Sequence, residues 1–186
     1  MKNNLFIIVG PSGTGKTTLL NELVNSDLNL KKIITYTTRH PREGEVDGVD
    51  YHFISTQVFN KMIINNEFAE YSNAYNNMYG TTKDSIYEED NQIVVLDSNG
   101  VLSLSLIRKN LVIIYLQLDI SKAKERILSR GLVDNLNHRL DIYYKEKKKI
   151  QNLTINEFNS GSKTELFNNV YNFIKKIKKK VDNSFK

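Results

Sequence analysis

The sequence contains no cysteine and only two prolines among its 186 residues. Without cysteine the chain cannot form a disulfide, use a thiolate as nucleophile or bind a metal through sulfur. It also lacks long apolar runs: segments 5–9, 93–96 and 111–116 are far shorter than the ~20 residues that a membrane-spanning helix needs. The first run leads into a glycine-rich loop and not into a small-residue cleavage site. We therefore expect no signal peptide, no membrane partner and a cytoplasmic location.

Length and composition indicate an ordinary folded domain. A chain of 186 residues with 40% apolar and 25% charged residues is long enough for one well-buried core and a small additional lobe. The net charge of +5 and the sequence pI near 9.2 favour anionic partners. Charge alone does not distinguish a nucleotide from a nucleic acid or a membrane surface.

Short β-branched runs alternate with longer segments of helical character, which is typical of an α/β fold with a doubly wound parallel sheet. Three of the runs are almost wholly apolar, as expected for strands that are covered on both faces. We expect strands over residues 5–9, 32–36, 92–97, 111–116 and 152–155. We expect helices over residues 16–25, 99–109, 121–130, 137–151 and 163–180.

Residues 37–91 interrupt this alternation. They contain the segment DYHFIS, a short helical stretch and a tyrosine-rich stretch, which together indicate a small, partly β lobe. We therefore expect a single domain whose core comprises residues 1–36 and 92–186, with an inserted lobe at 37–91.

The C-terminal segment FIKKIKKKVDNSFK carries many lysines. Its apolar residues recur at helical spacing, which favours a helix with one buried stripe and one solvated lysine face; they are Phe173, Ile174, Ile177 and Val181. The alternative is a basic arm that binds nucleic acid or a membrane. We favour the helix and expect no nucleic-acid partner.

The segment GPSGTGKTT at 10–18 follows an apolar strand and opens a helix, which is the context of a phosphate-binding P-loop. Its glycines allow successive backbone N–H groups to converge on one anion at a helix N-terminus. Lys16 is then placed to reach the β- and γ-phosphates of a bound nucleotide, and the Thr17 hydroxyl is placed to bind Mg²⁺. The predicted residues of this donor-nucleotide site in the loop are Gly10, Pro11, Ser12, Gly13, Thr14, Gly15, Lys16, Thr17 and Thr18.

Asp97 ends the buried run QIVVLD, at the carboxyl end of a predicted strand. Open α/β sheets bind their ligands at this end. We expect Asp97 to orient the hydrated Mg²⁺ or an arginine on the acceptor side. The alternative is that Asp97 only caps the helix that follows.

The segment TYTTRHPREGE at 35–45 places Arg39 and Arg42 on either side of Pro41. Proline disfavours a helix here, so the two arginines lie on a stiffened loop. Arginines held at a fixed spacing are suited to grip an oxyanion such as a phosphate.

The segment TTRHPREGEVDGVDYHF, with the P-loop upstream, closely resembles the acceptor loop of the guanylate kinase family. Every fixed position of the family pattern T-T-R-x-P-R-x-G-E-x-x-G-x-D-Y-x-F is matched at residues 37–53. The resemblance continues through NNEFAEY, the YG-T of 79–82 and the RG…HRL of 130–140, and so covers nearly the whole chain. It implies a P-loop nucleoside monophosphate kinase that transfers a phosphoryl group from ATP to GMP with Mg²⁺.

The resemblance also implies roles for single residues. The GMP phosphate would be held by Arg39, Arg42, Tyr51 and Tyr79. Glu70 matches the carboxylate that recognises guanine, and Thr35 and Thr81 match hydroxyl positions that complete the contacts to the base; Asp97 belongs to the same acceptor site.

A lid at approximately 130–139 would bring Arg130 and Arg139 over the transferred phosphoryl group. With Lys16 and Arg39 these arginines form the predicted catalytic set. Asn156 matches a family position near the adenine of ATP.

Two departures from the family separate this chain from its typical members. The segment LDSNG lacks the second aspartate of the family pattern D-x-D-x-x-G, and the lid RGLVDNLNHR is shorter and less acidic. These departures leave open the alternative that the protein is a kinase acting on dGMP or on a modified guanine nucleotide. A non-catalytic guanylate-kinase-like binding module is the other alternative, although such modules typically have degenerate P-loops. For the oligomeric state, a monomer and a homodimer are both compatible with the sequence.

Overall fold

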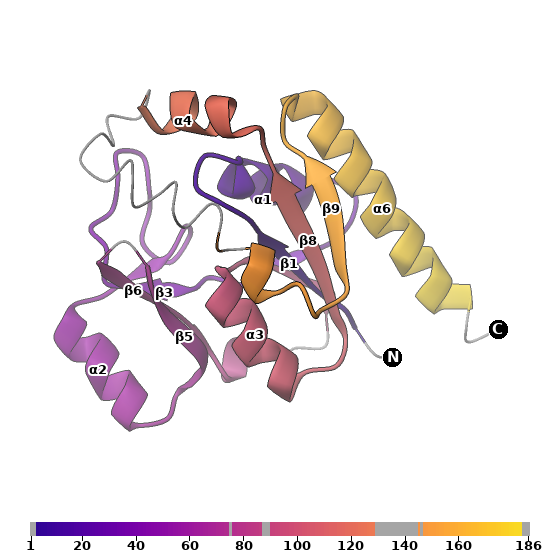
Figure 1. Ribbon diagram of the computed structural model, residues 1–186. Coiled ribbons are helices and arrows are strands. Elements are labelled where there is room, and N and C mark those ends of the chain that lie inside the picture. Colours follow the sequence, from indigo (N-terminus) through magenta and orange to yellow (C-terminus); the bar gives the residue numbers. More distant parts are fainter. Residues whose placement is uncertain (1–2, 75, 87–89, 129–144, 146, 184–186) are drawn as a thin grey trace.

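The computed structural model describes residues 3–74, 76–86, 90–128, 145 and 147–183. Its core is a five-stranded parallel sheet in the order β2-β7-β1-β8-β9 (Figure 1). The strands are β1 (Leu5–Val9), β2 (Lys31–Lys32), β7 (Gln92–Val95), β8 (Leu111–Gln117) and β9 (Ile155–Asn159). The predicted α/β fold with a parallel sheet is therefore confirmed.

Helices cover both faces of this sheet, which explains why every residue of β1 is buried. One face packs against α1 (Lys16–Val24) and α6 (Lys163–Asn183), and the other against α3 (Ser98–Ile107). The helix α4 (Ile120–Leu128) follows β8. Because the central strands are sandwiched between helices, they align the loops at their carboxyl ends into one rigid edge.

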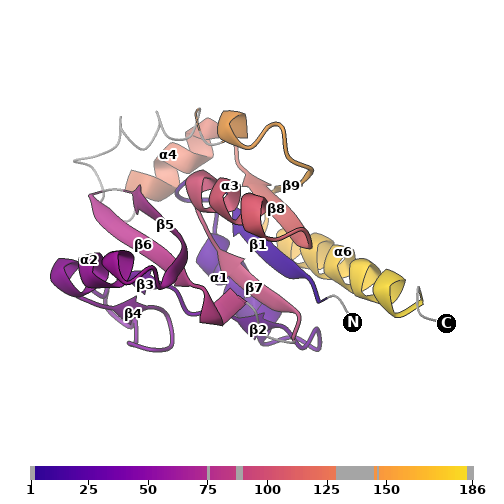
Figure 2. The ribbon, with the colours of Figure 1, turned by 90° about the horizontal axis from the view of Figure 1, so that it is seen from below.

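A second sheet of four strands lies beside the core, in the order β4-β3-β6-β5 (Figure 2). It comprises β3 (Tyr36–Thr37), β4 (His52–Phe53), β5 (Phe68–Ala74) and β6 (Asn77–Thr82). Helix α2 (Thr56–Ile64) packs against it through a small apolar cluster in which the Phe59 and Phe68 rings stack with their centroids 4.5 Å apart. A short 3₁₀ helix, Asp84–Ile86, then returns the chain to the core sheet.

Two predicted strands were placed wrongly. The predicted strand 32–36 is divided between two sheets: β2 pairs with β7 in the core, whereas β3 pairs with β4 and β6 in the second sheet. Pairing partners far away in the sequence decide this division. The strand predicted at 152–155 begins only at Ile155, because the Leu153 N–H is bonded to the Ile150 carbonyl in a turn.

The helices predicted near 16–25, 99–109, 121–130 and 163–180 are confirmed to within three residues at each end. The helix predicted over 137–151 lies mostly outside the described residues, although residues 147–149 are helical. In α6 the expected apolar stripe packs on the core: Ile174 is fully buried, with Phe173 and Ile177 beside it. Within the described part of the chain, no helix combines the length and the apolar character that crossing a bilayer requires.

The Ser98 hydroxyl at the start of α3 is buried, with a side chain only 1% exposed, and has no hydrogen-bond partner among the described residues. An unsatisfied buried hydroxyl destabilises the fold. We expect Ser98→Ala to raise the free energy of unfolding by about 1 kcal/mol in urea denaturation. The control is Ser105→Ala on the same helix, where the hydroxyl donates to Leu102 O at 2.7 Å. Equal effects of the two substitutions would contradict the expectation.

Candidate functional site

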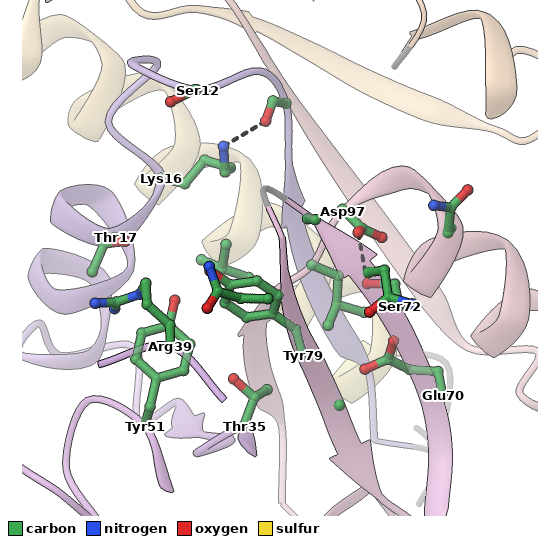
Figure 3. Close-up of a pocket in the computed structure, with 18 of the residues that line it drawn as sticks. Ser12, Lys16, Thr17, Thr35, Arg39, Tyr51, Glu70, Ser72, Tyr79 and Asp97 are labelled. Carbon is green, nitrogen blue, oxygen red and sulfur yellow. Dashed lines mark hydrogen bonds between the residues drawn. The ribbon is translucent and has the colours of Figure 1, made fainter. Parts of the chain in front are cut away.

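A cavity of about 1030 Å³ lies between the carboxyl edge of the core sheet and the second sheet (Figure 3). The P-loop lines one part of it, and β5, β6 and the loop after β3 line another. Of the residues predicted for the site, it is lined by Gly10, Ser12, Gly13, Gly15, Lys16, Thr17, Thr18, Thr35, Arg39, Arg42, Tyr51, Glu70, Tyr79 and Asp97. Residues as far apart in the sequence as Gly10 and Lys149 therefore line one cavity.

The P-loop presents the open N-terminus of a helix to this cavity. Gly15 is the N-cap of α1 in a left-handed conformation, with φ of 82°, and no side chain caps the helix. The first N–H groups of α1 thus have no side-chain cap, and together with the helix dipole they attract an anion.

Lys16 and Thr14 brace the loop in this structure. Lys16 Nζ donates to the carbonyl oxygens of Gly10 and Pro11, at 2.8 Å for Pro11. The buried Thr14 hydroxyl donates to the same Pro11 oxygen at 2.8 Å. The Thr17 side chain is exposed at the edge of the cavity.

Arg39 lies among aromatic rings on the opposite wall. Its guanidinium carbon is 5.4 Å from the centroid of the Tyr51 ring and 5.6 Å from that of Phe53. The Tyr51 and Tyr79 rings meet edge to face at 6.2 Å. Burial raises the pKa of Tyr51, so its phenol keeps its proton and can donate a hydrogen bond. Arg42 is exposed on the loop beside them.

Glu70 is a buried carboxylate, 5% exposed, on β5. Burial raises its pKa to about 7, against the effect of the Thr81 hydroxyl, which donates to Oε1. The negative charge of Asp97 raises this pKa further. A β-carbon at position 100 would lie 2.6 Å from Glu70 Oε2, so only glycine allows α3 to pack this closely on the carboxylate.

Asp97 caps α3, as the alternative interpretation of the sequence had it. Its Oδ1 accepts from the Gly100 N–H at 2.8 Å, and its Oδ2 accepts from the Ser72 hydroxyl at 2.6 Å (Figure 3). Capping does not remove it from the cavity, which it also lines. No three acidic or histidine side chains gather as a metal cage among the described residues.

Several predicted residues lie outside the cavity lining. Pro11 and Thr14 support the loop from behind, and Thr81 acts through its bond to Glu70. Asn156 lies on β9 and donates to Ile113 O at 3.0 Å, so its contact with ATP stays a prediction. Arg130 and Arg139 lie outside the described residues.

Sequence reasoning missed the other residues of the cavity, namely His40, Glu45, Ser72, Asn73, Ala74, Asn77, Gly80, Val95, Leu96, Asn99 and Lys149. The period of two along β5 could have identified Ser72, because it shares a face with Glu70. No local pattern marks Lys149, whose Nζ donates to Asn99 Oδ1 at 3.0 Å across 50 residues.

Known proteins resemble the chain over most of its length. A family model described as guanylate kinase matches residues 2–181. A guanylate kinase of Clostridioides difficile (strain 630) is 38% identical over 170 residues, covering 88% of this chain and 83% of that protein. One from Clostridium perfringens (strain SM101 / Type A) is 37% identical, covering 78% and 72%. The crystal structure of guanylate kinase from Anaplasma phagocytophilum superposes with a TM-score of 0.75 at 20% identity, covering 93% of this chain and 85% of that one.

The raised pKa of Glu70 makes stability depend on pH. The folded protein keeps the proton up to about pH 7, whereas the unfolded chain loses it near pH 4.5. The folded state therefore binds more protons between these values, and the free energy of unfolding falls as pH rises through this window. We expect the stability of the wild type, measured by urea denaturation relative to Glu70→Gln, to fall by about 3 kcal/mol from pH 4.5 to 7.5. A difference that does not vary with pH would contradict this assignment.

Proposed function

We propose that this chain, which belongs to the guanylate kinase family, transfers the γ-phosphoryl group of ATP to GMP, giving ADP and GDP. One observation carries the proposal: a buried carboxylate suited to guanine and an arginine–tyrosine cluster suited to a phosphate share one cavity with a P-loop. The donor cradle and the acceptor site thus open on the same space.

The P-loop would hold the donor phosphates. The N-terminus of α1 offers backbone N–H groups and a positive dipole end to the β-phosphate. Lys16 bonds to carbonyl oxygens of the loop here, and a bound triphosphate would offer its Nζ stronger, charged acceptors. Movement of this one side chain would bring a positive charge to the phosphoryl group being transferred.

The acceptor phosphate would lie on the wall formed by Arg39, Arg42, Tyr51 and Tyr79. Guanidinium groups bind phosphate oxygens in pairs, which sets the direction of the phosphate as well as its position. The protonated phenol of Tyr51 adds a donor. The attacking atom is a phosphate oxygen that already carries negative charge, so the transfer needs no general base.

Glu70 would select the base. Its two carboxylate oxygens can accept from guanine N1–H and N2–H₂ side by side, whereas adenine presents an acceptor at N1. A site built to bond such donors rejects a base that lacks them by a factor of roughly 10⁴. Thr35 lines the same part of the cavity, and the Thr81 hydroxyl orients the carboxylate through Oε1.

The oxygen donors at the P-loop fit a magnesium ion. Mg²⁺ needs only one or two protein oxygens when it also binds substrate phosphates, and the exposed Thr17 hydroxyl at the cavity supplies one. Asp97 already accepts two hydrogen bonds, so we assign it to orienting bound water rather than to direct binding. When bound, the ion would neutralise charge on the phosphates.

The remaining assignments belong to the same proposal. The second sheet and α2, within residues 37–91, would form the GMP-binding lobe on the core of 1–36 and 92–186. Arg130 and Arg139 of the expected lid would complete the charge around the phosphoryl group. We assign the protein to the cytoplasm, as a monomer or homodimer.

A nucleoside monophosphate panel tests the proposal. We expect release of ADP that depends on GMP and not on AMP, CMP or UMP. Glu70→Gln should lower kcat/KM for GMP at least about 100-fold and reduce the preference for GMP over AMP, since the amide opposes one donor of guanine with its own N–H₂. The matched control is Glu67→Gln, an exposed change three residues away that should leave both values within about twofold.

Absence of GMP-dependent turnover in the wild type would refute the proposal. A protein that binds ATP in calorimetry without turnover would instead be a binding module. Faster turnover of dGMP than of GMP would identify the deoxynucleotide as the acceptor.

We expect Lys16→Ala to lower kcat at least about 100-fold, because the developing charge on the phosphoryl group loses its cation.

A further inference from the structure

Glu45 lines the cavity, and its carboxylate contacts both arginines of the acceptor loop. Its Oε1 accepts from Arg39 Nη2 at 2.9 Å, and its Oε2 accepts from the Arg42 backbone N–H at 2.7 Å. The Glu45 N–H in turn donates to the Arg42 carbonyl at 3.0 Å, closing a tight turn through Glu43 and Gly44. One side chain therefore joins the first guanidinium to the backbone that carries the second.

This contact is partly shielded from water. The side chains of Arg39 and Glu45 are 13% and 19% exposed, so their ion pair is screened less than a surface pair. The rings of Tyr51 and Phe53 lie on the guanidinium at 5.4 and 5.6 Å, and Nη1 donates to the His40 carbonyl at 2.7 Å. Four contacts from the protein itself therefore restrain the Arg39 guanidinium.

The held guanidinium keeps capacity for a ligand. A guanidinium has five N–H donors, of which Arg39 uses one on Nη1 and one on Nη2 in these two bonds. The other three have no hydrogen-bond partner among the described residues, and the Arg39 residue lines the cavity. Glu45 occupies one donor and leaves enough to bind a phosphate.

We propose that Glu45 is a positioning residue for the acceptor phosphate: it holds Arg39 and the backbone of Arg42 in the geometry that binds a nucleoside monophosphate. This inference rests on the proposed function. It adds a residue that itself bears no contact to the substrate and acts through the two arginines.

Two effects of the carboxylate on the ligand have opposite signs. Its negative charge repels a dianionic phosphate, which would weaken binding. Its bonds order a long arginine and a loop, which strengthens binding because less side-chain freedom is lost when the ligand arrives. We expect ordering to dominate, since both bonds are short and the bond to Arg39 is partly shielded from water. The direction in which affinity for GMP changes when the carboxylate is removed therefore shows whether repulsion or ordering dominates.

Glu45→Gln tests the proposal by removing the charge while keeping the size. The amide can accept from one partner, but its N–H₂ group faces the other donor. We expect KM for GMP to rise 10- to 100-fold with KM for ATP unchanged within about twofold, as for displaced substrate-positioning groups. Affinity for guanosine, which has the base without the phosphate, should stay unchanged. The control is Glu43→Gln on the same turn, an exposed residue without a hydrogen bond or ion pair to another described residue.

Each outcome bears on a separate claim. If the wild type turns over GMP and Glu45→Gln binds GMP as tightly or more tightly, Glu45 does not position the arginines. An equal loss of GMP and guanosine affinity would show general damage to the lobe and also overturn the proposal. If Glu45→Gln does not fold, Glu45→Asp serves instead: it keeps the charge but is too short to reach both donors, and the same selective loss is expected. Absence of GMP turnover by the wild type would refute the proposed function, whereas the GMP affinity of Glu45→Gln relative to the wild type would still test the role of Glu45.

Discussion

The close approach of β5 to the N-terminal end of α3 is the contact on which the site depends. It brings the second sheet onto the core where the Ser72 hydroxyl donates to Asp97 and where the Glu70 carboxylate packs closely against Gly100. Glu70 is buried by this approach, and its raised pKa is the electrostatic consequence. Without the contact the two sheets would not enclose a common cavity.

In the proposed function, the buried carboxylate of Glu70 would accept a cost in stability in return for recognition of the base. Ionised Glu70 is unfavourable in the free protein, and two donors from guanine would satisfy it. A solvated carboxylate would bond water equally well and discriminate little between bases. Burial would therefore make Glu70 selective in its proposed role, and glycine at position 100 provides the space for the carboxylate.

In the proposed function, the two ends of the cavity would bind their charged ligands in different ways. The P-loop relies on backbone N–H groups and a helix dipole, which are fixed once α1 forms. The acceptor wall relies on long side chains, which need ordering by neighbours. Aromatic rings and Glu45 supply that order for Arg39. A rigid donor cradle and a braced acceptor wall are suited to hold two phosphates in line.

The sequence by itself determined the alternation of strands and helices, the P-loop and the acceptor loop, because these depend on local periodicity and on residues adjacent in the chain. Tertiary structure alone decided that residues 32–36 divide between two sheets, since their partners lie about 15 to 60 residues away. It also decided that Asp97, besides capping the next helix, accepts a bond from Ser72, and that Glu70 is buried. Burial and long-range bonds follow from how elements pack, which no local pattern records.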